Sequence, residues 1–151
     1  MCAISGIFSK NINDEQIDLL KKINNILTHR GPDSTGLYND SDVVLGHNRL
    51  AILDLSKNGH QPMISKTGRY ILTFNGEIYN HIQIRKNFFD NFNWRGTSDT
   101  ETLVELIEKK GINESLKIID GMYAFGLWDR KERKLIITRD KFGEKPLYYA
   151  F

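Results

Sequence analysis

The spacing of apolar residues changes along the chain and predicts a mixture of strands and helices. Residues 3–8, AISGIF, form a short apolar run with β-branched side chains, which is typical of a buried strand. Residues 12–27, INDEQIDLLKKINNIL, place their apolar side chains on one stripe of a helix instead. Asn13 is the expected N-cap of this helix, and Gln16 three positions later completes a capping box. The chain is therefore expected to start in a sheet and to continue into an amphipathic helix.

Strand patterns dominate the rest of the chain and are separated by loops and two helical stretches. The predicted strands are VVLGH, RLAILDL, RYILTF, MYAFGLWD and KLIITRD, the last two forming a hairpin across the turn RKER. HRGPDSTG and SKNGHQPM are expected loops, and the strand RYILTF is expected to stop at residues 75–77, NGE. Helices are predicted at IYNHIQIRKNFF and at TSDTETLVELIEKKG, where Ser98 and Glu101 form a capping box and Gly111 ends the helix. With no repeat or Pro-rich linker, this order predicts a single α+β domain over residues 1–151 with antiparallel sheets.

Composition and charge narrow the class of protein. Hydrophobic residues make up 40% and charged residues 26%, close to the averages of soluble globular domains. The 21 basic and 19 acidic residues are scattered and give a net charge of +2, so neither a nucleic acid nor an anionic membrane is expected as a partner. No signal peptide or membrane span is expected, and a single cysteine allows neither an internal disulfide nor a Cys/His zinc cluster. We therefore expect a cytoplasmic protein without a metal.

That single cysteine is the second residue of the chain. Removal of Met1 would leave a residue that carries both a thiol and a free α-amine. An α-amine has a reference pKa of about 8 and can act as a base toward its own side-chain nucleophile near neutral pH. Alternatively, a small residue follows the initiator methionine by chance. Cys2 is thus a candidate nucleophile whose role depends on the loss of Met1.

Four further residues could supply the other contacts that acyl transfer needs. Asn75 and Gly76 could present a side-chain amide and a backbone N–H to a developing oxyanion, although Asn-Gly is also a common turn. Arg49 could bind a carboxylate in a two-pronged manner, and Asp99 could bind an ammonium group. The alternatives are that Arg49 is a surface residue and that Asp99 only complements the dipole of its helix. Charged residues of the loops HRGPD and RDKFGEKP are expected to order those loops.

Eight segments in a fixed order carry a wider pattern. They are MC, HRGPDSTG, GHNRLAILDLS, GHQPM, FNGEIYNH, SDTE, GMYAFGLWD and RDKFGEKPLYY. Together they resemble the glutaminase domain of glutamine-dependent asparagine synthetases, a class II glutamine amidotransferase of the N-terminal-nucleophile hydrolase fold. NGEIYN combined with SDTE resembles the asparagine synthetase branch of that class. The resemblance covers the whole chain and implies a four-layer α-β-β-α sandwich of two antiparallel sheets.

The resemblance also implies a role for each candidate residue in the hydrolysis of L-glutamine to glutamate and ammonia. Cys2 matches the nucleophile that forms a thioester, and Asn75 with Gly76 matches the oxyanion hole. Arg49 and Asp99 match the residues that bind the α-carboxylate and the α-amine of glutamine. Other positions that the resemblance places against glutamine are Leu50, Ala51, Ile52, Leu53 and Glu77. It implies no cofactor for this reaction.

A partner domain is implied as well. In asparagine synthetases the ammonia reaches an ATP-pyrophosphatase domain that adenylates aspartate with ATP and Mg, and these 151 residues contain no such domain. We expect that domain in the same full-length chain or in a separate subunit. A different ammonia acceptor, in surface-polysaccharide or antibiotic amidation, and a non-catalytic module that binds glutamine are the alternatives. A homodimer is also compatible with the sequence.

Overall fold

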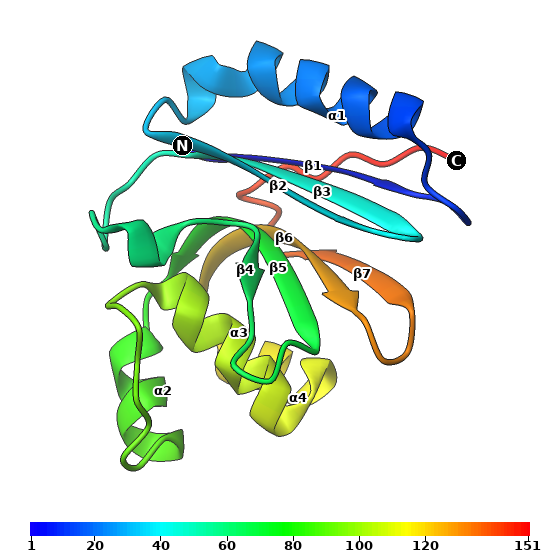
Figure 1. Ribbon diagram of the computed structural model, residues 1–151. Coiled ribbons are helices and arrows are strands. Elements are labelled where there is room, and N and C mark those ends of the chain that lie inside the picture. Colours follow the sequence, from blue (N-terminus) through cyan, green and yellow to red (C-terminus); the bar gives the residue numbers. More distant parts are fainter.

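The computed structural model describes residues 1–151, which form seven β-strands and four α-helices. The strands are β1 (Ala3–Phe8), β2 (Ser34–Asp40), β3 (Val43–Arg49), β4 (Met63–Ile64), β5 (Tyr70–Ile78), β6 (Gly121–Asp129) and β7 (Lys134–Arg139). The helices are α1 (Asp14–Ile26), α2 (His81–Phe88), α3 (Asp99–Lys110) and α4 (Ile112–Ile118), with short 3₁₀ turns η1 (Leu27–Arg30) and η2 (Lys57–Gly59). All strands pair antiparallel, in two sheets of order β1-β3-β2 and β4-β5-β6-β7 (Figure 1).

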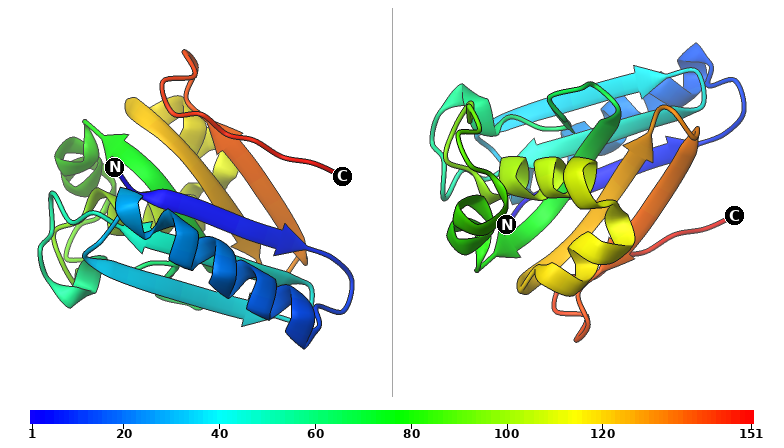
Figure 2. Two further views of the ribbon diagram at one scale, coloured as in Figure 1. Left: turned by 90° about the horizontal axis from the view of Figure 1, so that it is seen from above. Right: turned by 90° about the horizontal axis from the view of Figure 1, so that it is seen from below.

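The helices cover the outer faces of the two sheets. Helix α1 crosses the three-stranded sheet, whereas α3 and α4 lie against the four-stranded sheet on the opposite side (Figures 1 and 2). Helix α2 lies beside α3. The order of layers is therefore helix, sheet, sheet, helix, which confirms the expected α-β-β-α sandwich.

Several elements form where local sequence signals predict them. Asn13 Oδ1 accepts a hydrogen bond from Gln16 N at 2.9 Å, and Asn13 N donates to Gln16 Oε1 at 3.0 Å, so the capping box of α1 is confirmed. The hairpin of β6 and β7 is also confirmed. Gly111 ends α3 with a φ of 77°, a left-handed conformation that favours glycine. Each of these signals depends on residues only a few positions apart.

Only half of the capping box expected for α3 is present. Ser98 Oγ accepts a hydrogen bond from Glu101 N at 3.2 Å and caps the helix. The Glu101 carboxylate, however, accepts hydrogen bonds from the backbone N–H groups of Arg95 and Gly96 instead of returning to Ser98. It therefore holds the loop in front of the helix.

Three expected boundaries between strands and loops were wrong. Strand β3 ends at Arg49, so the strand predicted over residues 49–55 is a loop, in which Ile52 and Leu55 are 66% and 80% exposed. Strand β5 does not stop before Asn75 but continues to Ile78, paired with β6 throughout. The loop predicted as HRGPDSTG is shorter than expected because β2 begins within it.

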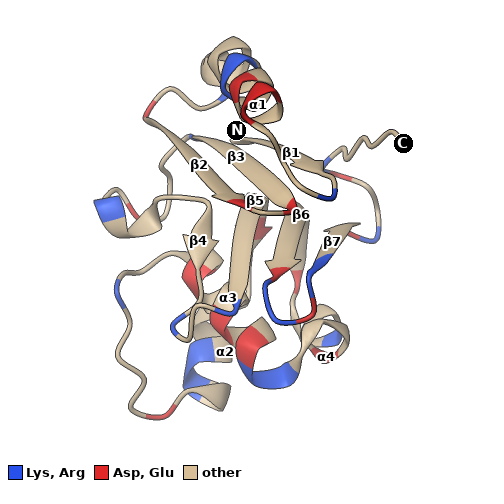
Figure 3. Ribbon diagram, turned by 45° about the vertical axis from the view of Figure 1, so that its right-hand side comes forward, with Lys and Arg blue, Asp and Glu red and all other residues tan.

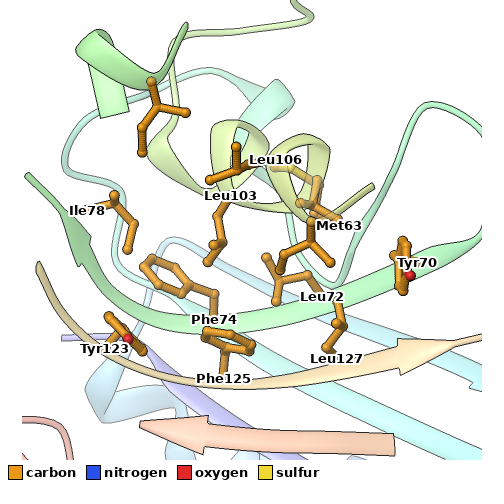
Figure 4. Packing of buried hydrophobic residues seen from close by; sticks show 13 residues of the cluster. Met63, Tyr70, Leu72, Phe74, Ile78, Leu103, Leu106, Tyr123, Phe125 and Leu127 are labelled. Atoms are coloured by element: carbon orange, nitrogen blue, oxygen red, sulfur yellow. The ribbon is translucent and has the colours of Figure 1, made fainter. Parts of the chain in front are cut away.

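Alternate residues of β5 point to two different cores. Leu72 and Phe74 face α3 in the main core of thirteen buried residues (Figure 4). Ile71 faces the other sheet, where it packs with Trp128 and two residues of β3. Thr73 shares that inter-sheet face, since its Oγ1 donates to the carbonyl oxygen of Gly46 on β3 at 2.9 Å. By the same alternation, Asn75 lies on the inter-sheet face of β5.

Charged side chains lie mainly on the helices and turns that surround the sheets. Both blue and red segments occur on these helices and turns in Figure 3. None of the helices combines the length and the apolar character that a membrane span would need.

Candidate functional site

A cavity of about 90 Å³ lies where the N-terminus, the loop after β3, strand β5 and the start of α3 meet. Nine of the ten predicted site residues line it: Cys2, Arg49, Leu50, Ile52, Leu53, Asn75, Gly76, Glu77 and Asp99. Ala51 is the exception, because it lines a neighbouring cavity on the other side of the loop. Segments far apart in the sequence therefore converge on one cavity.

Cys2 is held at the cavity by the strand that follows it. Ala3 is the first residue of β1 and pairs with Asn48 of β3, so the N-terminal segment is fixed to the sheet. Leu50 N donates to Cys2 Sγ at 3.4 Å, and the Leu50 carbonyl oxygen lies 3.6 Å from the same sulfur. Arg30 Nε donates to the Cys2 carbonyl oxygen at 3.4 Å. The thiol consequently has a defined position beside the loop after β3.

Met1 also lines the cavity and is 55% exposed. Its sulfur lies 3.0 Å from Nζ of Lys145, a lysine that is itself only 6% exposed. Lys145 comes from the segment after β7, which Asp140 orders by accepting four hydrogen bonds from backbone N–H groups. Loop ordering by charged residues was expected there.

Asn75 and Gly76 lie at an edge of the four-stranded sheet. Strand β4 contains only two residues, which pair with Ile71 and Leu72, so β5 has no neighbouring strand on that side beyond Leu72. Alternate residues of an antiparallel strand direct their N–H groups to the same side. The N–H groups of Phe74 and Ile78 point to this edge and are accepted by side chains. The N–H of Gly76, midway between them, therefore points to the same edge and toward the cavity.

Two side chains accept the neighbouring N–H groups of this edge. Gln61 Oε1 accepts from Phe74 N at 2.7 Å, and Asp99 Oδ2 accepts from Ile78 N at 2.9 Å. Glycine is required at position 76 for close packing, because a Cβ there would lie 2.2 Å from the carbonyl oxygen of Met122. The structure thus brings the expected donor pair to a sheet edge and not to a strand end.

Arg49 is the last residue of β3 and is only 9% exposed, so the alternative of a surface residue is wrong. Its Nη1 donates to the carbonyl oxygen of Ser56 at 2.7 Å, and its Nη2 donates to the carbonyl oxygen of Asp54. A Cβ on Gly59 would lie 2.1 Å from Nη2. The guanidinium is therefore held by two loop carbonyls against a glycine.

Asp99 begins α3 and is 5% exposed. Its carboxylate accepts hydrogen bonds from Ile78 N at 2.9 Å and from Thr100 N at 2.8 Å, so it does more than complement the helix dipole. Burial raises the pKa of Asp99 above its ordinary value, and the nearby charge of Glu77 acts in the same direction. A cation bound in the cavity would relieve both effects, because an opposite charge favours the ionised carboxylate.

Some cavity residues were not found by sequence reasoning. They include Asp54, Gly59, Gln61, Met122 and Lys145. The sequence Asp-Leu-Ser at residues 54–56 is a usable signal, because aspartate side chains commonly bond to a backbone N–H two residues later in turns. No group of three or more His, Cys, Asp or Glu side chains with the proximity needed for a metal occurs in the chain.

Comparison with known proteins identifies the family. Residues 1–151 match the model of the glutamine amidotransferase domain. The glutamine-hydrolyzing asparagine synthetase B of Escherichia coli is 36% identical over 154 residues, which cover 100% of this chain and 27% of that protein. Glutamine-hydrolyzing asparagine synthetase 1 of Bacillus subtilis is 38% identical, over 99% of this chain and 24% of that protein. The corresponding protein 1 of Arabidopsis thaliana is 35% identical, over 100% and 26%.

The chain therefore spans about a quarter of the length of these curated relatives. The family match, in contrast, covers every residue of the chain, including all those that line the cavity. The chain belongs to the glutamine amidotransferase domain family.

Proposed function

We propose that this chain hydrolyses L-glutamine to glutamate and ammonia, with Cys2 as the nucleophile. The observation that carries the proposal is the single cavity shared by Cys2, Arg49, Asn75, Gly76 and Asp99. Family membership supports the same reaction.

The first half of the reaction forms a thioester. After Met1 is removed, the α-amine of Cys2 takes the thiol proton, directly or through a water molecule, and the thiolate attacks the carboxamide carbon of glutamine. A C–S bond forms while the electron pair of the carbonyl moves onto its oxygen. Asn75 Nδ2 and the Gly76 N–H donate hydrogen bonds to this oxyanion, and one such donor is worth about 3–4 kcal/mol. The reaction therefore needs hydrogen-bond donors in the cavity that holds the sulfur, and this edge of the sheet supplies them.

The second half releases both products. The protonated α-amine gives its proton to the leaving nitrogen, the C–N bond breaks, and ammonia departs. Water then attacks the γ-glutamyl thioester through a second oxyanion at the same two donors, and glutamate is released with the thiol restored. In this half the free α-amine of Cys2 takes the proton of the attacking water and returns it to the sulfur when the C–S bond breaks.

Recognition of the substrate uses the two ends of the amino-acid group. Arg49 would bind the α-carboxylate through the guanidinium face that its two loop carbonyls leave free. Asp99 would bind the α-ammonium, helped by the charge of Glu77. Holding both groups keeps the carboxamide in attack range of the sulfur, which lowers the entropic part of the barrier.

The relatives named above are glutamine-hydrolyzing asparagine synthetases. By likeness to them, we infer that the ammonia serves the amidation of aspartate in an ATP-pyrophosphatase domain that uses ATP and Mg. That domain would belong to the same full-length chain or to a separate subunit. A reducing cytoplasm is the natural setting, because it keeps the single thiol unoxidised.

Labelling and hydrolysis together test the proposal. The purified chain is incubated with a glutamine-like diazoketone, and peptide mass spectrometry locates the adduct, which is expected on Cys2 alone. Glutamate release is measured in parallel and is expected to be lost in Cys2→Ala. Undiminished hydrolysis by Cys2→Ala, or full activity of a protein whose intact mass retains Met1, would contradict the mechanism. Binding of glutamine without turnover would favour a non-catalytic module.

A further inference from the structure

Asp54 connects two loops beside the cavity. Its side chain belongs to a residue that is only 6% exposed and lines the cavity. Asp54 Oδ1 accepts hydrogen bonds from Ser56 N at 2.8 Å and Ser56 Oγ at 2.6 Å. Asp54 Oδ2 accepts from Thr97 N at 2.8 Å, across 43 positions of the sequence. One carboxylate therefore holds the loop after β3 and the loop before α3.

On the first loop, these bonds set the position of Arg49. The carbonyl oxygens that hold the guanidinium belong to Asp54 and Ser56, the same two residues that the Asp54 carboxylate folds into a turn. If that turn opened, both carbonyls would move and the guanidinium would lose its two acceptors. The direction of Arg49 thus depends on the Asp54 side chain.

On the second loop, the same carboxylate sets the approach to Asp99. Thr97 directly precedes Ser98, the N-cap of the helix that Asp99 begins. Gly96 permits the contact, because a Cβ there would lie 2.3 Å from Asp54 Oδ2. The Glu101 carboxylate holds this loop from the helix side. The loop is therefore clamped between two buried carboxylates.

The Asp54 carboxylate is ionised near neutral pH. The hydrogen bond from the Ser56 hydroxyl is the largest cause that lowers its pKa to about 2, and burial opposes this effect. The backbone N–H of Thr97 and the positive charge of Arg49 lower the pKa further. Asp54 therefore joins the two loops as a carboxylate anion that accepts three hydrogen bonds.

We propose that Asp54 is a positioning residue for glutamine recognition, whose carboxylate fixes the separation between Arg49 and Asp99. Those residues bind the α-carboxylate and the α-ammonium in the function proposed above, on which this inference rests. In this role Asp54 acts through Arg49 and Asp99 and not by contact with glutamine. It makes the two recognition residues act as one unit.

The substitution Asp54→Asn tests this role at nearly constant volume. In Asp54→Asn the amide oxygen keeps both donors of Ser56, whereas the NH₂ that replaces Oδ2 cannot accept the hydrogen bond of Thr97 N, so the contact with the loop before α3 opens. KM for glutamine is expected to rise by about ten- to a hundredfold, the range for one lost hydrogen bond to a charged group, while kcat changes by less than about threefold. An unchanged KM, or equal losses in KM and kcat, would overturn the proposal.

A substrate analogue without the α-amine distinguishes displacement of Asp99 from a general loss of affinity for the substrate. In the wild type, omission of the amine is expected to raise KM strongly because Asp99 loses its partner. In Asp54→Asn the same omission should raise KM much less, because Asp99 is already displaced. An equal penalty in both proteins would show that Asp54 does not couple the two residues.

Asp129→Asn is the matched control. Asp129 is 5% exposed, and its carboxylate accepts hydrogen bonds from Lys131 N and Glu132 N in the turn after β6 and from the side chain of Arg69, which precedes β5. It does not line the cavity. This variant should lose stability without a change in KM, and a KM increase equal to that of Asp54→Asn would overturn the proposal.

Two further measurements complete the test. If Asp54→Asn does not fold, Gly96→Ala pushes a Cβ against Asp54 Oδ2 and should produce the same selective rise in KM. If the wild type binds glutamine without hydrolysing it, the proposed function fails, and calorimetric affinities of the same variants still decide the role of Asp54. Weaker binding by Asp54→Asn would support it, and equal binding would overturn it. A wild type that neither binds nor hydrolyses glutamine would overturn both proposals.

Discussion

His47 lies on β3 between the two sheets, and its replacement by glutamine is expected to remove much of the protein's sensitivity to acid. The ring is fully buried, and its Nε2 lies 3.0 Å from the carbonyl oxygen of Phe74, so that nitrogen carries the proton and donates it. Its Nδ1 has no hydrogen-bond partner. Burial lowers the pKa of His47 from 6.5 to about 4, and the charges of His60 and Arg49 act in the same direction, against the bond to Phe74.

The sign of the effect follows from which state binds the proton more tightly. Between pH 6.5 and 4 the unfolded chain protonates this histidine and the folded chain does not, so stability falls as the pH falls through that window. Each unit of pKa difference corresponds to 1.36 kcal/mol, which gives a limiting loss of about 3 kcal/mol below pH 4. At pH 5 the loss relative to pH 7.5 is about 2 kcal/mol.

Urea unfolding of the wild type and His47→Gln measures this difference. The glutamine amide can still donate to Phe74, and the fluorescence of the buried Trp128 reports unfolding. Asp99 and Glu105, whose pKa values burial raises, are present in both proteins and cancel in the comparison. Between pH 7.5 and 5, His47→Gln is expected to lose about 2 kcal/mol less of its unfolding free energy than the wild type.

Two results would refute this reasoning. One is an identical dependence of stability on pH in the two proteins. The other is an NMR titration in which the ring of His47 changes its charge near pH 6.5 in the folded protein. Either result would show that the inter-sheet layer admits a proton at little cost.

Three further substitutions probe the cavity and its supports. Gly59→Ala places a Cβ 2.1 Å from Arg49 Nη2, so steady-state kinetics should show KM for glutamine raised by about tenfold or more; an unchanged KM would mean that the guanidinium position is not limiting. Gly76→Ala brings a Cβ 2.2 Å from the Met122 carbonyl oxygen and should lower kcat by about a hundredfold, the size of one lost oxyanion donor; a kcat close to that of the wild type would count against the sheet edge as the donor site. Ser98→Ala removes the side-chain cap of α3 and should cost about 1 kcal/mol in urea unfolding; equal stability would show that the cap contributes nothing measurable.

Local signals in the sequence were sufficient for the start of α1, the end of α3 and the hairpin of β6 and β7. The cap at Asn13 and the left-handed end at Gly111 depend on residues within one helical turn, and the alternation of β6 and β7 is read from consecutive positions. Features that depend on contacts between distant segments could not be predicted from the local sequence. The apolar run at residues 50–55 has the composition of a strand, but no neighbouring strand pairs with it, so it forms a loop along the cavity.

The same distinction applies to the site. Residue type and position made Cys2, Arg49 and Asp99 candidates beside structural alternatives, and the resemblance to a known family implied their roles. The edge position of Asn75 could not be predicted, since it follows from the two-residue length of β4. The turn of Asp54 with Ser56 has a local signal, but the contact of Asp54 with Thr97, 43 positions away, could not be predicted from the sequence.

The position of the two halves of the site on different sheets has a consequence for the interior of the protein. The proposed nucleophile precedes β1 in one sheet, whereas the proposed oxyanion donors lie on β5 in the other. The gap between them is set by the layer of side chains packed between the sheets, which includes the cluster around Ile71 and Trp128, and by the hydrogen bonds that Thr73 and His47 make from one sheet to the other. The thickness of this layer therefore affects the rate at which the thiolate attacks the substrate. A methyl group lost there, far from any substrate atom, would change the distance between the sulfur and the oxyanion donors. The turnover rate therefore limits which substitutions the hydrophobic interior accepts.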